Sequence, residues 1–141
     1  MEREHIEKIG KQVIDALFEV DRELGPGLLE SAYEMSLAHE LKLRGLTFER
    51  QFSVPITYKG VKLECGFRLD VLVAGEIVLE LKSVEALLPI HDAQLVNYLL
   101  LSGKRIGFLV NFNVPRLKDG IKRRVNKLDD DSRRPKDFVL S

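Results

Sequence analysis

A chain of 141 residues is long enough to bury an ordinary hydrophobic core, and we expect residues 1–141 to form a single domain. Its 45% hydrophobic and 31% charged residues are typical of folded soluble proteins. The 22 basic and 22 acidic residues cancel, which argues against a chain-wide attraction to nucleic acid but not against a local basic patch. Because Cys65 is the only cysteine and no apolar run reaches the length of a membrane span, we expect a cytoplasmic protein.

The first part of the chain predicts two helices. Apolar residues recur at three- and four-residue spacing through residues 4–24, which indicates an amphipathic helix whose role is packing. A Gly-Pro-Gly break follows, and we expect a second helix over residues 28–44, closed by Gly45 at its C′ position. Glu30 and Tyr33 share one face of this helix. Glu30 either complements the positive helix N-terminus or directs a carboxylate into the domain.

Three strands are expected next. Residues 48–58 and 61–73 read as two arms joined at Lys59–Gly60, and Gly66 inside the second arm suggests a bulge or a close backbone approach. The stretch 67–82, FRLDVLVAGEIVLELK, then forms a second hairpin with the same central arm. Together these segments predict a three-stranded antiparallel meander.

The second hairpin carries charges inside an apolar stretch. A three-residue turn, Ala74–Gly75–Glu76, would place Asp70 opposite Glu80, whereas a two-residue turn would send Glu80 to the other face; we expect the former. Lys82 then lies beside Glu80 on the same face. Two carboxylates about 5 Å apart repel by roughly 3 kcal/mol at an effective dielectric of about 20. A divalent cation between the two carboxylates would make their closeness favourable, which indicates a metal site. The alternative interpretation is a surface ion pair of Glu80 with Lys82 that contributes little to stability.

A further helix is expected after a loop at residues 87–90. It runs from residue 91 or 92 to residue 102, with Asp92 as a plausible N-cap. Gln94 and Tyr98 are four residues apart and therefore lie on one face. They are either ordinary half-buried polar residues or groups that orient a bound phosphate or a metal-bound water.

The last predicted element is a buried strand over residues 105–112. An antiparallel meander followed by a helix and this strand indicates an α/β fold, in which helices flank a mixed β-sheet. Residues 116–127 contain six basic residues and the single acid Asp119. This basic stretch is either a solvated face or a patch that contacts a nucleic-acid backbone.

Four short motifs occur in an order that resembles the GxxExxY protein family, which is related to the PD-(D/E)XK nuclease superfamily and its restriction-endonuclease-like core. The motifs are Gly27-x-x-Glu30-x-x-Tyr33, Phe67-Arg68-Leu69-Asp70, Glu80-x-Lys82 and Gln94-x-x-x-Tyr98. The resemblance covers roughly residues 14–125. It departs from the superfamily pattern at Leu69, where the superfamily name has proline.

The resemblance implies a divalent-metal-dependent nuclease. It makes Glu30, Asp70 and Glu80 the metal ligands, with Mg²⁺ or Mn²⁺ as the cofactor. Asp70 and Glu80 are also catalytic through that cation, and Lys82 is the catalytic lysine. The reaction implied is hydrolysis of phosphodiester bonds in nucleic acid, with DNA favoured as the substrate.

Substrate contacts follow from the same resemblance. The Gln94 and Tyr98 stripe is similar to one that helps to hold the substrate in RecB-like exonucleases, and we expect Tyr33 and Arg68 to add contacts. The alternative function is a catalytically idle nuclease-like domain that acts as a nucleic-acid-binding or protein-interaction module. Hydrolysis of another phosphate ester is a third reading. No membrane partner is expected, and both a monomer and a homodimer stay open.

Overall fold

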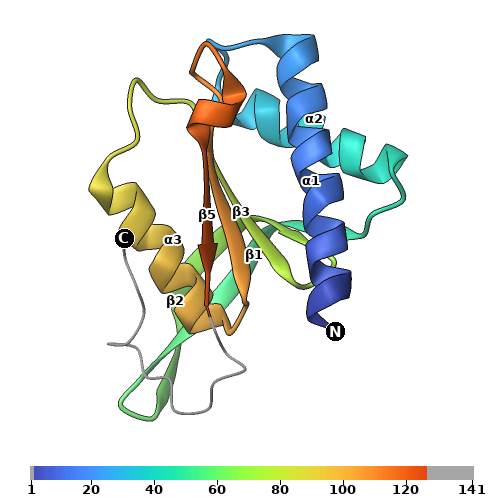
Figure 1. The fold of residues 1–141 in the computed structure, drawn as a ribbon. Coiled ribbons are helices and arrows are strands. Elements are labelled where there is room, and N and C mark those ends of the chain that lie inside the picture. Colours follow the sequence, from blue (N-terminus) through green and yellow to red (C-terminus); the bar gives the residue numbers. More distant parts are fainter. Residues whose placement is uncertain (1, 127–141) are drawn as a thin grey trace.

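A five-stranded sheet separates two helices on one face from a third helix on the other (Figure 1). The computed structural model describes residues 2–126. In chain order its elements are α1 (Arg3–Leu24), α2 (Glu30–Leu43), β1 (Phe48–Tyr58), β2 (Val61–Val73), β3 (Ile77–Lys82), α3 (Pro89–Ser102), β4 (Ile106–Asn111), the 3-10 turn η1 (Leu117–Gly120) and β5 (Ile121–Val125). No described helix is both long enough and apolar enough to cross a membrane.

The sheet is mixed, as the sequence predicts. Strands β1, β2 and β3 form the antiparallel meander, β4 pairs parallel to β3 through the α3 crossover, and β5 pairs antiparallel to β4. The strand β5 was not expected, because the sequence IKRRV shows a charge run instead of apolar alternation. It is an edge strand, where charged side chains can face solvent and discourage pairing with other chains.

Two hydrophobic clusters hold the layers together. On one face, α1 and α2 bury residues such as Leu17 and Leu37 against Leu79 of β3. On the other face, Leu95 and Leu99 of α3 pack on β3 and β4. The helix approaches β4 closely at Gly107, where a Cβ atom would lie 2.8 Å from Leu95 Cδ1.

The hairpin of β1 and β2 contains the irregularity that the sequence suggested. The register shifts between Val54 and Ile56. A Cβ atom at Gly66 would lie 2.0 Å from the carbonyl oxygen of Val54, so only glycine fits this bulge. Gly45 has a φ of 73° and follows the Arg44 cap of α2, which confirms its predicted C′ position.

The start of α3 differs from the expectation. The helix begins at Pro89, so the expected loop at 87–90 is shorter and Asp92 is not the N-cap. Proline is well suited to the first helical position, where its missing N–H is not needed. His91 Nδ1 accepts the backbone N–H of Leu88 at 3.0 Å, and Asp92 instead lies 2.7 Å from Arg124 Nε of β5.

Candidate functional site

Strands β2 and β3 separate where two carboxylates face each other. Their backbone register pairs Val73 with Ile77 and ends at Val71 and Leu79, which confirms the three-residue turn. One step further, the backbone N–H of Asp70 donates to Glu80 Oε2 at 3.0 Å. The N–H of Leu81 in turn donates to Asp70 Oδ2 at 2.8 Å. Side-chain oxygens thus replace the backbone carbonyls of the ladder, and Asp70 lies opposite Glu80.

Burial makes this carboxylate pair electrostatically unusual. Burial is the largest cause that raises the pKa of Glu80 to about 8, and the negative charge of Asp70 is the second. The hydrogen bond from the Asp70 N–H acts in the opposite direction and lowers this pKa. Burial also raises the pKa of Asp70, and the Leu81 N–H partly opposes that rise. The pair therefore carries a repulsion that either a shared proton or a bound cation relieves.

Lys82 ends β3 beside this pair. Its alternation with Leu81 puts it on the Glu80 face of the strand, where it is half-buried. Its positive charge lowers the pKa of both Asp70 and Glu80. The backbone around it is fixed by its pairing with Asn111 of β4, so the ammonium group projects from an ordered strand end.

Glu30 lies at the rim of the same site. Its Oε2 accepts the backbone N–H of Ser83 at 3.3 Å, and the Ser83 hydroxyl donates to the carbonyl of Leu28. The negative charge of Glu30 also raises the pKa of Asp70. Within residues 2–126, however, no three His, Cys, Asp or Glu side chains gather closely enough to form a metal cluster.

Tyr33 is placed differently from the expectation. Its side chain has no exposed surface, and its ring stacks on Phe112 at a centroid distance of 4.2 Å. Its hydroxyl donates to the carbonyl of Gly25 and accepts the N–H of Leu28. We therefore correct the expectation of a substrate contact, because Tyr33 instead holds the loop that leads to Glu30. The same bonds keep Leu28 outside the helix, so α2 starts two residues later than predicted.

The expected substrate residues lie on two sides of the strands. Tyr98 of α3 stacks on Phe67 at 4.4 Å, and burial followed by the charges of Glu80 and Asp70 raises its pKa. Gln94 lies one turn earlier on α3 and is half-buried. Arg68 is exposed and follows Phe67, which packs on the α3 side, so strand alternation directs Arg68 away from α3.

A further carboxylate near Asp70 was missed from the sequence. Glu34 of α2 is only 8% exposed, and its negative charge raises the pKa of Asp70. It is held by Arg50 Nε at 3.0 Å and by Gln51 Nε2 at 2.9 Å. Its position four residues after Glu30, on the same helical face, was the available signal.

Asn111 fixes the loop between the site and α3. Its side chain accepts the N–H of Val84 and donates to the carbonyl of Val84, both at 3.0 Å. This buried amide extends the β3–β4 pairing by one step beyond the backbone, which orders the segment directly after Lys82. The sequence marked the same asparagine only as the end of a strand.

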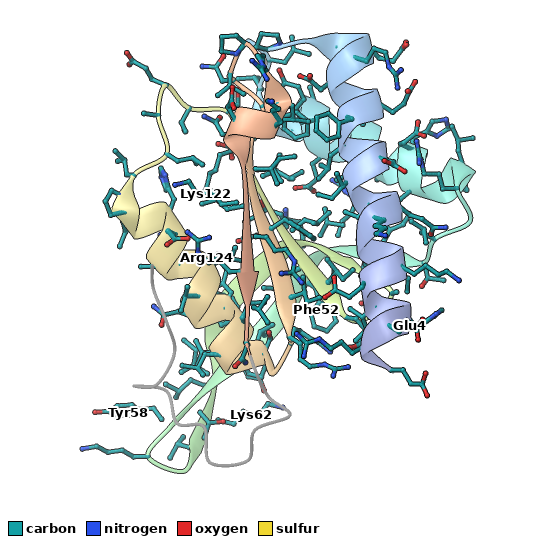
Figure 2. The ribbon with its side chains drawn as sticks, in the orientation of Figure 1. Glu4, Phe52, Tyr58, Lys62, Lys122 and Arg124 are labelled. Atoms are coloured by element: carbon teal, nitrogen blue, oxygen red, sulfur yellow. The ribbon has the colours of Figure 1, made fainter. Side chains whose placement is uncertain are left out.

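The basic stretch at 116–127 is largely engaged in ion pairs. Arg123 Nη2 lies 2.8 Å from Glu7 of α1, and Arg124 Nε lies 2.7 Å from Asp92 of α3. Figure 2 shows Lys122 and Arg124 on β5 next to α3. These contacts favour the structural interpretation for both arginines, and Lys127 lies outside the described residues.

The Asp70 and Glu80 pair fits a divalent cation. Each carboxylate accepts the backbone N–H of the opposite strand with one oxygen, and a hydrogen bond between the two carboxyl side chains adds to the rise in the pKa of Glu80. Hard oxygen donors that become negatively charged on deprotonation suit Mg²⁺ and Mn²⁺. A cation between them would remove the repulsion that raises the pKa of Glu80.

A family model described as the PD-(D/E)XK nuclease superfamily matches residues 7–124, a span that contains all the residues of the site. No curated protein and no solved structure matches the chain.

Proposed function

The chain belongs to the PD-(D/E)XK nuclease superfamily, and on that premise we propose that it is a divalent-metal-dependent nuclease that hydrolyses phosphodiester bonds. The observation that carries the proposal is the carboxylate pair of Asp70 and Glu80 at the point where β2 and β3 separate. The spacing of Gly27, Glu30 and Tyr33 further supports a place in the GxxExxY family.

Asp70 and Glu80 would hold Mg²⁺ or Mn²⁺, with Glu30 as a third ligand at the rim. Such a cation supplies Lewis-acid stabilisation of the phosphate and acidifies the attacking water. Glu80 would have to lose its proton first, because its pKa of about 8 favours the protonated form at neutral pH. The charge of Lys82 assists that loss.

Lys82 would act directly on the reacting groups. Its ammonium lies on the Glu80 face of β3, at the ordered end of the strand. A cation fixed there stabilises the negative charge that develops on the phosphate, or orients the attacking water. Removing one such preorganised group typically costs about 10²- to 10³-fold in kcat.

The substrate would lie across the end of β3. Tyr98 and Gln94 from α3 would contact it on one side and Arg68 from β2 on the other, which supports a polymer with several phosphates. DNA is the favoured substrate. The phenol of Tyr98 is protonated at neutral pH, because its pKa is raised, and can therefore donate to a phosphate oxygen.

The test is cleavage of single- and double-stranded DNA and RNA with Mg²⁺, with Mn²⁺ and with EDTA. We expect cleavage only with a metal ion, and loss of it in Asp70→Asn, Glu80→Gln and Lys82→Ala. Glu76→Gln makes the same chemical change at the other end of β3, in the turn, and should keep activity. Binding without cleavage under every condition would favour the idle nucleic-acid-binding module instead.

A further inference from the structure

The guanidinium of Arg50 is held by the carboxylate of Glu34 next to the site, yet the Arg50 side chain stays partly exposed. Its Nε lies 3.0 Å and its Nη2 2.9 Å from Glu34 Oε2. Gln51 Nε2 occupies the other oxygen, Oε1, at 2.9 Å. The Glu34 side chain is 11% exposed and the Arg50 side chain 39% exposed. Both oxygens of Glu34 are therefore engaged, whereas the partly exposed guanidinium has further donors.

The strand register puts this cluster beside the carboxylate pair. Arg50 pairs with Val71 and Phe52 pairs with Leu69, so Gln51 lies opposite Asp70. Gln51 also has a φ of 52°, which turns a non-glycine side chain off the regular strand alternation. Its amide reaches Glu34 from that position.

The charges around Asp70 set a requirement for any phosphate substrate. Four carboxylates lie around this region. Asp70 and Glu80 accept N–H groups across β2 and β3, Glu30 accepts the N–H of Ser83 just after β3, and Glu34 accepts from Gln51, which lies opposite Asp70. A phosphodiester approaching so many acids needs positive charge besides the metal ion. Lys82 supplies it at the end of β3, and Arg50 is the cation on the β1 side.

We propose that Arg50 binds a phosphate group of the nucleic-acid substrate and that Glu34, together with Gln51, is the positioning group that orients its guanidinium. This inference rests on the proposed function, because it deepens the description of the same site. A guanidinium carries five N–H donors in a fixed fork. Glu34 takes two of them, which leaves three for the non-bridging oxygens of a phosphate.

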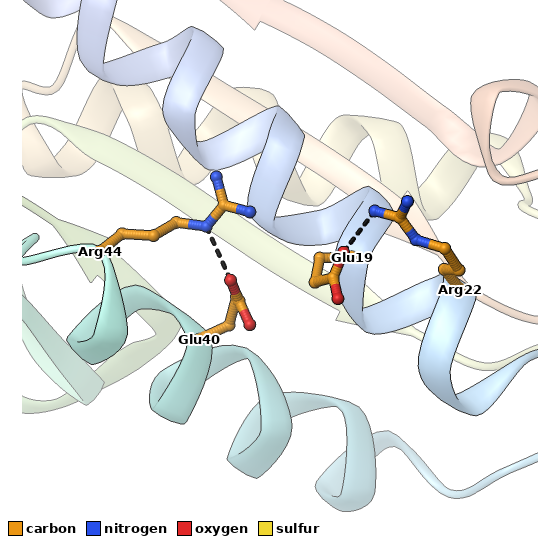
Figure 3. A network of polar contacts seen from close by, with 4 residues as sticks. All are labelled: Glu19, Arg22, Glu40 and Arg44. Atoms are coloured by element: carbon orange, nitrogen blue, oxygen red, sulfur yellow. Dashed lines mark hydrogen bonds and ion pairs between the residues drawn. The ribbon is translucent and has the colours of Figure 1, made fainter.

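The competing explanation is a brace that only ties α2 to β1. A matched ion pair on the same helix separates the two. Arg44 Nε lies 2.8 Å from Glu40 Oε2, the same type of contact, and Figure 3 shows this pair at the C-terminal end of α2, with the Glu19 and Arg22 pair on α1. Glu40 follows Glu34 by six residues, or roughly 9 Å along the helix at 1.5 Å per residue.

The experiment compares two double variants, Glu34→Gln/Arg50→Gln and Glu40→Gln/Arg44→Gln. Each removes one acid and one base, keeps the net charge and leaves amides that can hydrogen-bond, so neither buries an unpaired charge. Binding is measured by fluorescence anisotropy with a labelled single-stranded DNA oligonucleotide and with its duplex, in EDTA, over a series of salt concentrations. Thermal unfolding confirms that each variant is folded.

We expect the Glu34/Arg50 double variant to bind about tenfold more weakly, the value of one charge-assisted hydrogen-bonded contact. The slope of log K against log salt should fall by about 0.9 for the duplex or about 0.7 for the single strand, as one phosphate contact is lost. The Glu40/Arg44 double variant should match the wild type in both. Arg50→Lys, which keeps the charge but not the fork, should weaken binding without changing the salt slope.

Equal affinities and slopes for wild type, Arg50→Lys and both double variants would overturn the proposal and leave Arg50 as a brace. A wild-type chain that binds neither probe at low salt would also overturn it. The nuclease proposal is tested by a different outcome. Wild-type protein that binds DNA through Arg50 but never cleaves it would contradict the nuclease function and still support the phosphate contact.

Discussion

Glu80 is 7% exposed and has a second carboxyl group beside it, and its pKa of about 8 lies well above the 4.5 of the unfolded chain. Between pH 4.5 and pH 8 the folded protein therefore binds more protons at this residue than the unfolded protein. The free energy of unfolding is highest below this window and falls as the pH rises through it.

The first prediction concerns this pH dependence. Metal-free wild-type protein should lose on the order of a few kcal/mol of stability between pH 5 and pH 9. Glu80→Gln, which resembles the protonated acid, should lose clearly less over the same range and be more stable than wild type at pH 9. Chemical denaturation in EDTA at several pH values measures both. Glu76→Gln, whose carboxylate lies in the turn, should follow the wild-type curve.

The second prediction concerns Tyr33, whose hydroxyl bonds hold the loop before α2. Tyr33→Phe keeps the buried ring on Phe112 but removes both bonds, so it should lower the free energy of unfolding by about 1–2 kcal/mol. Tyr58→Phe is the control, because Tyr58 is 60% exposed at the tip of the β1–β2 hairpin (Figure 2). A Tyr33→Phe protein as stable as the control variant would contradict the structural role.

At the scale of elements, the contact of α3 with β4 decides where Tyr98 and Gln94 lie. Gly107→Ala would bring a Cβ atom to 2.8 Å from Leu95 Cδ1 and 3.1 Å from Leu99 Cδ2. We predict a loss of about 1–3 kcal/mol, the usual cost of overpacking, as α3 shifts. Gly10→Ala in α1 is the matched substitution, since its Cβ atom would meet Ile77 Cδ1 at an ordinary 3.8 Å.

The Gly10→Ala protein should gain up to about 1 kcal/mol, because alanine favours a helix interior over glycine. Thermal and urea unfolding measure whether each substitution raises or lowers the free energy of unfolding. Loss of stability in both variants, or in neither, would contradict the close contact of α3 with β4 at Gly107.

The elements also show where sequence reasoning succeeds. Both arms of the first hairpin, Phe48–Tyr58 and Val61–Val73, match the prediction residue for residue, because a turn glycine and β-branched residues define them locally. The turn at 74–76 fixes the register that opposes Asp70 to Glu80. These features depend on neighbours in the sequence, so the sequence is sufficient to predict them.

Other features depend on partners far along the chain. The strand β5 exists because β4 offers it an edge, although IKRRV alone favours no strand. Glu34 shares a helical face with Glu30, but its two partners, Arg50 and Gln51, reach α2 only through the fold of β1. The hydroxyl of Tyr33 could be directed into the site or into the loop with the same helical spacing, and tertiary packing decides for the loop.

At the scale of the whole molecule, a chain of zero formal net charge brings four of its 22 acids to one region. Asp70 and Glu80 lie in the sheet; Glu30 and Glu34 of α2 raise the pKa of Asp70, and the charges of Glu80 and Asp70 raise the pKa of Tyr98 on α3. Such a concentration is unfavourable in the metal-free protein. It becomes favourable if the folded state binds a divalent cation that the unfolded chain does not.

The measurement that tests the proposed metal site most directly is thermal unfolding at neutral pH with and without millimolar Mn²⁺. At a concentration of about 100 times Kd, binding adds about 2.7 kcal/mol, which raises Tm by roughly 10 °C for a chain of this size. We predict such a rise for wild type and for Glu76→Gln, and a much smaller one for Glu80→Gln, which should be at least as stable as wild type in EDTA. A wild-type Tm that Mn²⁺ leaves unmoved, together with a Glu80→Gln protein that is destabilised in EDTA, would contradict the metal site and make Glu80 a structural partner of Lys82.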